Sequence, residues 1–562
     1  MKITRYYPYW PHRLSQTLPV PVTSVYENLA VSARRYPEKV AIHYYGGSLT
    51  YAQFNDEVEK IAGYLQNVGV VKGDRVLLFM QNAPQFMISF YGILRANAVV
   101  VPINPMNITE ELAFYVQDCG IEVAIVGQEL FDRVHPLQDR GLLKHMIVAA
   151  YSDYISGDFP FDMPEEVRAP RQEIKGVNVT LWSEALKLNL QPGPHMVSGE
   201  DMAVLPYTSG TTGKPKGCVH THATVNANTV GAVYWSTYNT GSVVLTVLPL
   251  FHVTGLQHSM NAPIFAGSTM VLMTRWNRDV AGELIQKYGV THWVNIATMV
   301  VDFVSNPNLS RYKLETLASV GGGGAPLPEA VGEKLFQLTG VRYAEGYGLS
   351  ETISQTHFNP PDRPKLQCLG IPSFDVDARV LDGESSRELG PNEQGELVVN
   401  GPQVLKGYWN RPEENAAAFT EIDGKRFFRT GDIVKYDEEG YFFIVDRVKR
   451  MINAAGFKVW PTEIESILYK HPAVQQACVI GIPDERRGET VKAYVILQAG
   501  QQGKVSEEDI INWSKEQMAA YKYPRLVQFV DKLPVSASGK ILWRILQEEE
   551  AAKRKSERAS EG

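Results

Sequence analysis

The feature that most constrains the fold is an alternation of helix-like and strand-like segments that begins near residue 49. Thr50 and Gln53 have the spacing of a helix-capping box, and apolar residues then recur at helical intervals as far as Leu65. Short apolar runs follow at 74–80, 98–104 and 122–127, with helical patterns between them at 85–97 and 110–118. Strands separated by helices of this length predict parallel βαβ units.

The same alternation resumes further along the chain. A connection rich in Pro, Asp and Glu at 155–175 precedes a second α/β stretch at 200–345. Short β-like runs separated by turn residues occupy 366–446, and a compact α+β pattern follows Arg447. We therefore predict an α/β protein. Its large N-terminal domain has two parallel-type α/β subdomains plus a β-rich subdomain, and a small C-terminal α+β domain follows.

Composition excludes several classes of protein. With 562 residues and a net charge of −7, the chain shows no basic footprint for nucleic acid. Four cysteines without metal-like spacing form no disulfide framework and fit a reducing compartment. The first residues lack the apolar stretch of a signal peptide, and no run of about 18 apolar residues predicts a transmembrane helix. We expect a cytoplasmic protein, with peripheral membrane contact left open.

The string YTSGTTGKPKG at 207–217 carries the strongest chemical information. Its glycines, hydroxyl side chains and lysines offer backbone N–H groups, hydroxyl donors and positive charge in one loop, which suits a triphosphate. A Walker A pattern cannot be fitted to it. A flexible surface loop is the alternative interpretation. The residues predicted to bind phosphate are Thr208, Ser209, Gly210, Thr211, Thr212, Gly213, Lys214 and Lys216.

This string resembles the phosphate-binding signature of the AMP-forming adenylate superfamily, which includes acyl-CoA synthetases, luciferases and peptide-synthetase adenylation domains. Further strings similar to those of the family follow in the family's order. They are PLFHVTG (249–255), SVGGGGAPLP (319–328), EGYGLSET (345–352), RTGD (429–432), DRVKRMINAAGFKVWPTEIE (446–465) and PVSASGKILWR (534–544). The resemblance runs from about residue 25 to residue 545.

The resemblance implies roles for residues in the first three of these strings. His252 would border the acyl and pantetheine channels. Tyr347 would stack on adenine, and Glu351 would hold Mg2+ beside the phosphates, since a hard cation takes oxygen ligands. Ser350 stands where the family has threonine, and it keeps the hydroxyl group. The remaining positions expected along the nucleotide are Gly323, Gly324, Ala325, Pro326, Glu345, Gly346 and Gly348.

The last three strings would complete the site. By resemblance, Asp432 accepts the ribose hydroxyls and Arg447 contacts ribose or phosphate. Lys449 would be the hinge between a large domain at 1–448 and a small, mobile domain at 449–562. Gly456 would let the pantetheine arm pass, and Lys540 would reach the substrate carboxylate and the α-phosphate, where a cation offsets developing charge.

The sequence therefore predicts an AMP-forming acid–thiol ligase that uses ATP, Mg2+ and coenzyme A. Lys540, Glu351, His252 and Thr208 are the predicted catalytic residues. Two segments expected at the acyl pocket, 253–263 and 293–299, are mostly apolar and carry no fixed cation, which favours a medium- or long-chain fatty acid over an amino acid. The string MTRWNRD at 273–279 also resembles fatty acyl-CoA synthetases.

Other interpretations stay open at this stage. The acid substrate could be aromatic, as in a cinnamate ligase. An adenylation module that feeds a carrier protein, a luciferase-like oxidase and a non-catalytic nucleotide- or acyl-binding protein on the same fold are further alternatives. A homodimer is compatible with the sequence.

Overall fold

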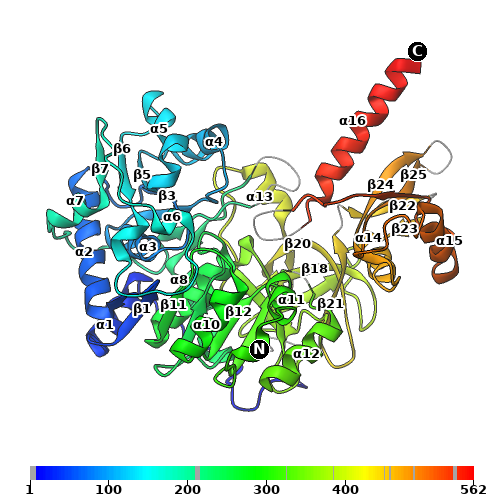
Figure 1. Cartoon of the computed structure of the whole chain (residues 1–562), viewed down its shortest axis with the longest axis horizontal. Coiled ribbons are helices and arrows are strands. Elements are labelled where there is room, and N and C mark those ends of the chain that lie inside the picture. Colours follow the sequence, from blue (N-terminus) through cyan, green and yellow to red (C-terminus); the bar gives the residue numbers. More distant parts are fainter. Residues whose placement is uncertain are drawn as a thin grey trace. The chain divides into compact units, whose positions relative to one another are not determined.

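The computed structural model describes residues 8–208, 215–324, 326–383, 385–447, 450–454, 457–484, 488–535 and 541–561. The chain divides into two compact units (Figure 1). The first comprises Met1–Gly210, Lys214–Asp377 and Asn400–Arg426, and the second comprises Thr211–Gly213, Ala378–Val399 and Phe427–Gly562. Residues 378–399 and 427–447 thus group with the C-terminal residues, whereas the predicted hinge at Lys449 lies outside the described residues and stays a prediction.

Seven strands in the described part of the first unit form a largely parallel sheet. They are β3 (Arg75–Phe79), β4 (Val99–Pro102), β5 (Val123–Gly127), β6 (His145–Ala149), β7 (Val179–Leu181), β8 (Met202–Val204) and β9 (His220–Thr221). Their order is β7-β6-β5-β3-β4-β8-β9, and only β9 runs antiparallel to its neighbour. The connecting helices are α3 (Pro84–Arg95), α4 (Thr109–Cys119) and α5 (Phe131–Asp139). The predicted βαβ alternation is confirmed.

A second sheet in this unit joins the N-terminal end of the chain to its middle. Its order is β16-β15-β14-β13-β12-β10-β11-β1-β2, with parallel pairing from β14 to β1. The strands are β1 (Val40–Tyr44), β2 (Gly47–Thr50), β10 (Val243–Thr246), β11 (Thr269–Leu272), β12 (His292–Asn295), β13 (Ser319–Gly323), β14 (Ala344–Leu349), β15 (Ser354–Phe358) and β16 (Ile371–Pro372).

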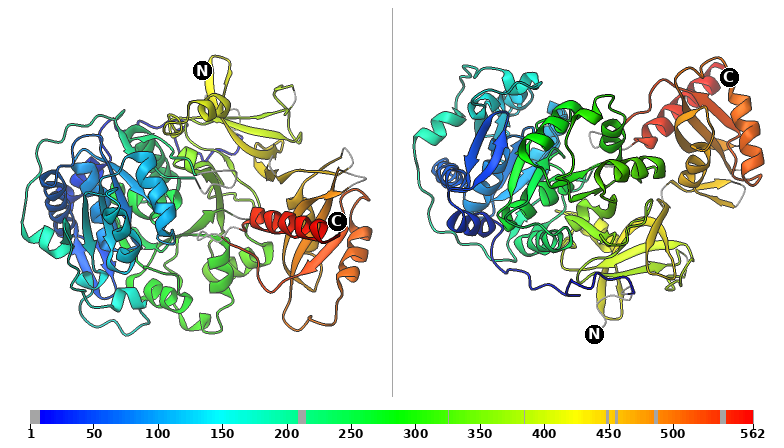
Figure 2. Two further views of the ribbon diagram at one scale, coloured as in Figure 1. Left: turned by 90° about the horizontal axis from the view of Figure 1, so that it is seen from above. Right: turned by 60° about the horizontal axis from the view of Figure 1, so that its bottom comes forward.

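Helices buried between these two sheets supply the core. The capping box predicted at Thr50 and Gln53 is confirmed at the start of α2 (Tyr51–Asn67), which packs against α3. One cluster of buried side chains continues from β3 and β5 of the first sheet, through α2 and α3, to β1 and β11 of the second. Figure 2 shows the blue-to-cyan and green parts of this unit side by side.

The first unit contains nine further α-helices in its described residues. They are α1 (Tyr26–Arg35), α6 (Glu165–Arg168), α7 (Trp182–Lys187), α8 (His222–Trp235), α9 (Ala262–Ala266), α10 (Arg278–Tyr288), α11 (Ala297–Val304), α12 (Glu329–Thr339) and α13 (Pro412–Ala418). Of these, α1 and α8 contribute to the same core cluster. The unit also contains β19 (Phe419–Ile422).

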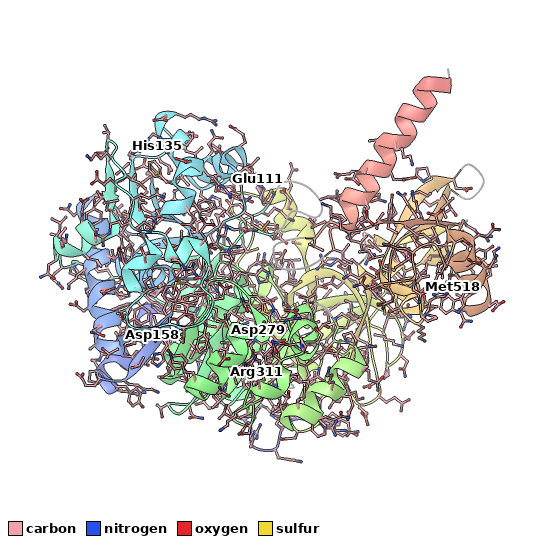
Figure 3. All side chains as sticks on the ribbon, viewed as in Figure 1. Glu111, His135, Asp158, Asp279, Arg311 and Met518 are labelled. Carbon is pink, nitrogen blue, oxygen red and sulfur yellow. The ribbon has the colours of Figure 1, made fainter. Side chains whose placement is uncertain are left out.

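The string MTRWNRD has a structural explanation at the start of α10. Asn277 accepts hydrogen bonds from the backbone of Asp279 and Val280, so it caps the helix. Asp279, labelled in Figure 3 near Arg311, accepts hydrogen bonds from Asn306 and from the Tyr312 hydroxyl at 3.0 Å each. These bonds tie the loop around η4 (Leu309–Arg311) to the helix.

The second unit contains two sheets in its described residues. In the first sheet β18 (Gly395–Asn400) lies between β17 (Asp377–Leu381) and β20 (Lys425–Tyr436), and β20 pairs with β21 (Phe442–Arg447). The second sheet has the order β23-β22-β25-β24, with β26 beside β25. Its elements are β22 (Ile452–Ala454), β23 (Phe457–Val459), β24 (Val474–Asp484), β25 (Gly488–Leu497), β26 (Leu526–Phe529), α14 (Pro461–Leu468) and α15 (Glu507–Gln517).

The charged C-terminal segment forms a helix, α16 (Trp543–Glu561). Leu546 packs in a buried cluster with β24 and β25, and Glu550 accepts a hydrogen bond from Lys492 at 2.7 Å. Both charged side chains are over 90% buried, so the start of this helix is part of the folded unit. Within the described residues, no helix combines the length and the apolar character needed to cross a bilayer.

Candidate active site

The base of the predicted phosphate loop is closed by backbone pairing. Tyr207 and Gly217 form an antiparallel bridge, and the Thr208 N–H donates to the Lys216 carbonyl at 3.0 Å. The Lys216 N–H in turn donates to the Thr208 hydroxyl at 3.2 Å. Thr208 and Lys216 therefore face each other at the two ends of the loop. The other predicted phosphate ligands, Ser209, Gly210, Thr211, Thr212, Gly213 and Lys214, lie outside the described residues.

A hydrogen-bonded cluster anchors this base to α4. The Tyr207 hydroxyl donates to Asp118 Oδ2 at 2.6 Å and lies 2.8 Å from Cys119 Sγ. Arg411 donates to Asp118 Oδ1 at 2.6 Å. Burial, together with Cys119 and Asp118, raises the pKa of Tyr207, so the hydroxyl stays a protonated donor. Asp118 accepts from both partners and thus links the loop to the segment around Arg411.

Ser350 and Glu351 lie in a short 3₁₀ turn, η5 (Ser350–Thr352), which follows β14. The buried ring of His220 contacts the Ser350 carbonyl through Nε2 at 2.7 Å. Burial lowers the pKa of His220 to about 4, so the ring is neutral and donates this hydrogen bond. The Leu405 N–H donates to the Glu351 carbonyl at 2.8 Å. The turn is therefore fixed from two directions.

The Glu351 side chain contacts a tyrosine that the sequence did not single out. The Tyr408 hydroxyl donates to Glu351 Oε1 at 2.9 Å. The Lys216 ammonium lies 4.0 Å from the centroid of the same ring. The structure thus brings together Glu351 and Lys216, two predicted ligands of Mg2+ and phosphate, around Tyr408.

Tyr408 reaches this position because its segment pairs with the strand that leaves the phosphate loop. Cys218 and Tyr408 form an antiparallel bridge, and the Trp409 N–H donates to the Gly217 carbonyl at 2.8 Å. The string GYWNRP at 407–412, with two aromatic residues and an arginine in a loop, was the available sequence signal. A pairing between residues so distant in sequence gives no local pattern.

The predicted adenine segments lie on adjacent strands. In the register of β13 and β14, Gly323 is paired with Gly346. A Cβ atom on Gly323 would come within 2.5 Å of the Gly346 carbonyl, so the close approach of these strands requires glycine. Gly324 has φ +90° and is exposed, as is Pro326. Ala325 lies outside the described residues.

Gly348 is likewise required by packing, since a Cβ atom there would lie 1.8 Å from the Ser354 carbonyl oxygen. Tyr347 is half-buried, and its ring lies 5.8 Å from that of His357 in an edge-to-face arrangement. Adenine stacking on Tyr347 stays a prediction.

The Glu345 carboxylate accepts hydrogen bonds from backbone N–H groups. Oε1 accepts from the N–H groups of Leu327 and Gln367 at 3.0 Å, and Oε2 accepts from Cys368 at 3.1 Å. Burial raises the pKa of Glu345 to about 7, although these three N–H groups lower it. The side chain therefore holds the chain after the glycine segment in place. Its role as a nucleotide ligand stays a prediction.

His252 precedes an unusual helix. Residues Gly255–Asn261 form a π-helix, η3, a geometry that is rare and frequent at functional sites. The Thr254 N–H donates weakly to His252 Nδ1 at 3.4 Å, and the His252 carbonyl accepts from Leu256 at 2.9 Å. Gly255 is needed there because a Cβ atom would lie 2.3 Å from the Pro249 carbonyl oxygen.

The two segments predicted to form the acyl pocket contact each other, because β12 packs against η3. Burial lowers the pKa of His258 to about 4, so this residue of η3 is neutral. Trp293 is fully buried and stacks on Trp276 in a hydrophobic core cluster. Which residues of the two segments line an acyl pocket stays a prediction. The half-buried residues of this strand and its end are Val294 and Ile296.

In the second unit the predicted ribose ligands form an ion pair. Arg447 Nε lies 2.8 Å from Asp432 Oδ1, and the two residues face each other in the register of β20 and β21. The Asp432 side chain is 2% exposed, whereas that of Arg447 is 42% exposed. Lys449, Gly456 and Lys540, three further predicted site residues, lie outside the described residues.

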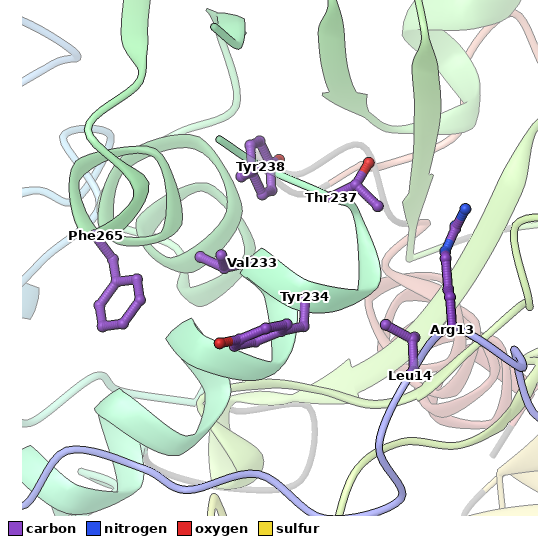
Figure 4. Close-up of a pocket in the computed structure, with 7 residues that line it drawn as sticks. All are labelled: Arg13, Leu14, Val233, Tyr234, Thr237, Tyr238 and Phe265. Carbon is purple, nitrogen blue, oxygen red and sulfur yellow. The ribbon is translucent and has the colours of Figure 1, made fainter. Parts of the chain in front are cut away.

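A separate hollow of about 400 Å3 opens at the end of α8. In Figure 4, Phe265 and Arg13 lie at its two ends, with Val233 and Tyr234 between them. The other lining residues are Leu14, Thr237 and Tyr238. None of these seven residues is one of the predicted site residues.

Comparison with known proteins identifies the family. Residues 29–409 match the AMP-binding enzyme family, and residues 463–540 match the AMP-binding enzyme C-terminal domain. The chain belongs to the AMP-binding enzyme family. The resemblance inferred from the motifs is confirmed, and this chain is an enzyme of that family.

Individual relatives cover nearly the whole chain. A long-chain-fatty-acid–CoA ligase of Bacillus subtilis (strain 168) is 36% identical over 555 residues, which cover 96% of this chain and 97% of that protein. A feruloyl-CoA synthase of an Amycolatopsis species is 32% identical and covers 91% and 96%. The ATP-bound crystal structure of MatB from Rhodopseudomonas palustris has a TM-score of 0.80 at 26% identity and covers 94% and 99%. The α/β fold class, with its large N-terminal and small C-terminal domains, is confirmed.

Proposed function

We propose that this enzyme activates a medium- or long-chain fatty acid in two steps. The fatty acid carboxylate attacks the α-phosphorus of ATP, the bond to the β-phosphate oxygen breaks, and acyl-AMP and pyrophosphate form. The thiol of coenzyme A then attacks the acyl carbonyl, and AMP leaves as acyl-CoA forms. The observation that carries the proposal is the contact of Glu351 and Lys216 with a single tyrosine at the base of the phosphate loop.

The chemistry demands positioning and charge compensation rather than a protein nucleophile. Two anions, a carboxylate and a triphosphate, must approach each other, so positive charge at the reacting phosphate stabilises the transition state. Lys216 at the loop base would bind phosphate oxygens, and Lys540 is proposed to reach the α-phosphate. Thr208, held by Lys216, would donate its hydroxyl to a phosphate.

A magnesium ion fits the residues around Glu351. A carboxylate with one oxygen held by a phenol presents its second oxygen in a fixed direction, and hard cations take oxygen ligands. When bound, the ion would offset charge on the phosphates. Ser350, beside Glu351, would orient an α-phosphate oxygen through its hydroxyl.

In the second unit, Asp432 would accept the two ribose hydroxyls, with Arg447 holding the carboxylate in place. A hinge at Lys449 is proposed from the resemblance alone. Arg447 pairs with Asp432 on β20, whereas Arg450 pairs with Glu465 on α14 and also lies 3.9 Å from Asp446 on β21. We propose that Gly456 and His252 border the route of the pantetheine arm. Cytoplasmic location, membrane contact and a homodimer stay predictions of the sequence.

The choice of a fatty acid is supported by the 36% identity to the Bacillus subtilis long-chain-fatty-acid–CoA ligase. The neutral state of His258 on η3 agrees with it, because this segment then presents no fixed cation to an acyl chain. An aryl acid is the second candidate, since the Amycolatopsis feruloyl-CoA synthase is 32% identical.

One substrate panel tests the proposal. AMP formation is measured with acids from acetate to oleate, and with benzoate and ferulate, in the presence and absence of coenzyme A. We expect the highest kcat/KM with acids of medium or long chain and formation of acyl-CoA when the thiol is present. A preference for ferulate would favour the second candidate, and ATP binding without AMP formation from any acid would contradict ligase activity.

A further inference from the structure

Tyr408 stands between two opposite charges of the candidate site. Its hydroxyl donates to Glu351 Oε1 at 2.9 Å, while the Lys216 ammonium lies over its ring at 4.0 Å. The residue is 6% exposed. No ion pair joins Lys216 to Glu351 in the part of the chain that the structure describes. The tyrosine therefore contacts both groups.

The backbone of Tyr408 is fixed independently of these contacts. Its N–H donates to Asn415 Oδ1 at 2.6 Å, and its carbonyl accepts from Asn415 Nδ2 at 2.9 Å. On its other side it forms the bridge with Cys218. The backbone position from which the side chain extends is therefore set by the protein itself.

The phenol hydroxyl of Tyr408 donates its hydrogen bond to Glu351 Oε1. A hydrogen bond to Oε1 fixes the plane of the carboxylate and leaves Oε2 to face a cation. The ring gives the Lys216 ammonium a favourable contact that neutralises none of its charge. A direct ion pair would instead satisfy both groups with each other and compete with ligands.

We propose that Tyr408 is a positioning residue that keeps the carboxylate of Glu351 for a divalent cation and the ammonium of Lys216 for the triphosphate by holding them apart. This role rests on the proposed function and assigns to its site a residue outside the predicted set. It has two separable parts, one carried by the hydroxyl and one by the ring.

Two variants separate these parts. Tyr408→Phe removes the hydroxyl and keeps the ring, whereas Tyr408→Leu removes both. Tyr51→Phe is the matched control, because Tyr51 is fully buried and its hydroxyl donates to the Ser268 carbonyl at 2.7 Å, away from every predicted site residue. Thermal unfolding of all three variants reports any general loss of structure.

Binding of Mn2+ together with a non-hydrolysable ATP analogue, measured by electron paramagnetic resonance, tests the hydroxyl without any turnover. We expect Tyr408→Phe to weaken Mn2+ binding about tenfold, the size of a lost hydrogen bond to a charged group, and Tyr51→Phe to leave it unchanged. Adding Tyr408→Phe to Glu351→Ala should cause no further loss, because the two changes act on one contact.

The ring is tested by analogue binding at saturating Mn2+. Tyr408→Leu should weaken it about threefold beyond Tyr408→Phe, as Lys216 loses its aromatic contact and turns to Glu351. Wild-type Mn2+ binding in Tyr408→Phe, or additive losses with Glu351→Ala, would overturn the proposal. These binding measurements need no acid substrate. If the enzyme formed no AMP with any acid, the proposed function would be contradicted, but the binding results for Tyr408 could still be interpreted.

Discussion

The two groups of charged residues in the candidate site are built in opposite ways. In the first unit, Glu351 and Lys216 each contact Tyr408, and the described residues show no ion pair between them. In the second unit, Asp432 and Arg447 form a direct ion pair at 2.8 Å. An ionic ligand such as a metal–triphosphate needs charges that are not already neutralised, whereas a neutral diol needs only an oriented acceptor. The difference indicates which part of the nucleotide each group is suited to bind.

The largest effect is expected where an unneutralised charge is removed. Glu351→Ala takes away the proposed ligand of the metal, so kcat/KM for adenylate formation should fall at least about a hundredfold, since a bound cation supplies several kcal/mol of charge stabilisation. Initial rates of pyrophosphate release measure this. Glu315→Ala, at an exposed acid, is the control and should keep the wild-type rate. A loss of less than about fivefold in Glu351→Ala would show that Glu351 does not bind the metal.

A smaller effect is expected from the paired group. Asp432→Asn keeps the shape but loses the charged acceptor, so the KM for ATP should rise about tenfold with little change in kcat. Arg447 is partly exposed and stays solvated, so the loss of stability should be about 1 kcal/mol. Steady-state kinetics measures the change in KM, and urea unfolding measures the loss of stability.

The control is Asp377→Asn, which breaks a comparable pair with Lys425 at 2.8 Å outside the site. It should lower stability to a similar extent and leave the KM for ATP unchanged. Equal KM values in both variants would mean that Asp432 does not contact the nucleotide.

A third test concerns the anchor beneath the phosphate loop. Asp118→Asn weakens the bonds from Tyr207 and Arg411, both largely shielded from water, so the free energy of unfolding should fall by about 2 kcal/mol. The KM for ATP should rise about fivefold without a change in Mg2+ dependence. Glu110→Gln, which breaks the exposed pair with Arg140, should cost under about 0.5 kcal/mol. An altered Mg2+ dependence in Asp118→Asn would show that Asp118 affects the same metal site as Tyr408.

The last test concerns a dependence of stability on pH. The pKa of Glu345 is about 7 in the folded protein and 4.5 ordinarily. The folded state therefore binds more protons between these values, and stability falls as pH rises through about 5 to 7. In Glu345→Gln the loss of stability between pH 5 and pH 8, measured by urea unfolding, should be smaller by about 2 kcal/mol than in the wild type.

The comparison with wild type isolates Glu345, because Glu57 and Glu129 also have raised pKa values, about 6 and about 7, and contribute equally to both proteins. An unchanged pH dependence in Glu345→Gln would show that its carboxyl is ionised in the folded state throughout this range.

Much of the fold was predictable because its determinants are local. The capping box at Thr50 and the apolar runs of β3 and β5 each identify one element from neighbouring residues. The pairing of β1 with β11 was not predicted, since residues 40–44 and 269–272 share no local pattern. The turn between β1 and β2 contains Gly46, which has φ +88°.

The site divides in the same way. The motifs identified Glu351 and Lys216 as residue types suited to a metal and a phosphate. They did not identify Tyr408, because its role arises only when residues 406–409 pair with residues 217–219. The motifs also did not say which residues of 293–299 meet the core, since an apolar strand has two faces; Trp293 packs in a core cluster.

Exchange of labelled pyrophosphate into ATP, without coenzyme A, tests most directly whether a carboxylate is joined to a nucleotide in this site. The account predicts exchange that depends on a medium- or long-chain fatty acid and on Mg2+, and that is lost in Glu351→Ala but kept in Glu315→Ala. Exchange that is absent with every acid, while ATP still binds, would contradict the formation of an acyl-adenylate.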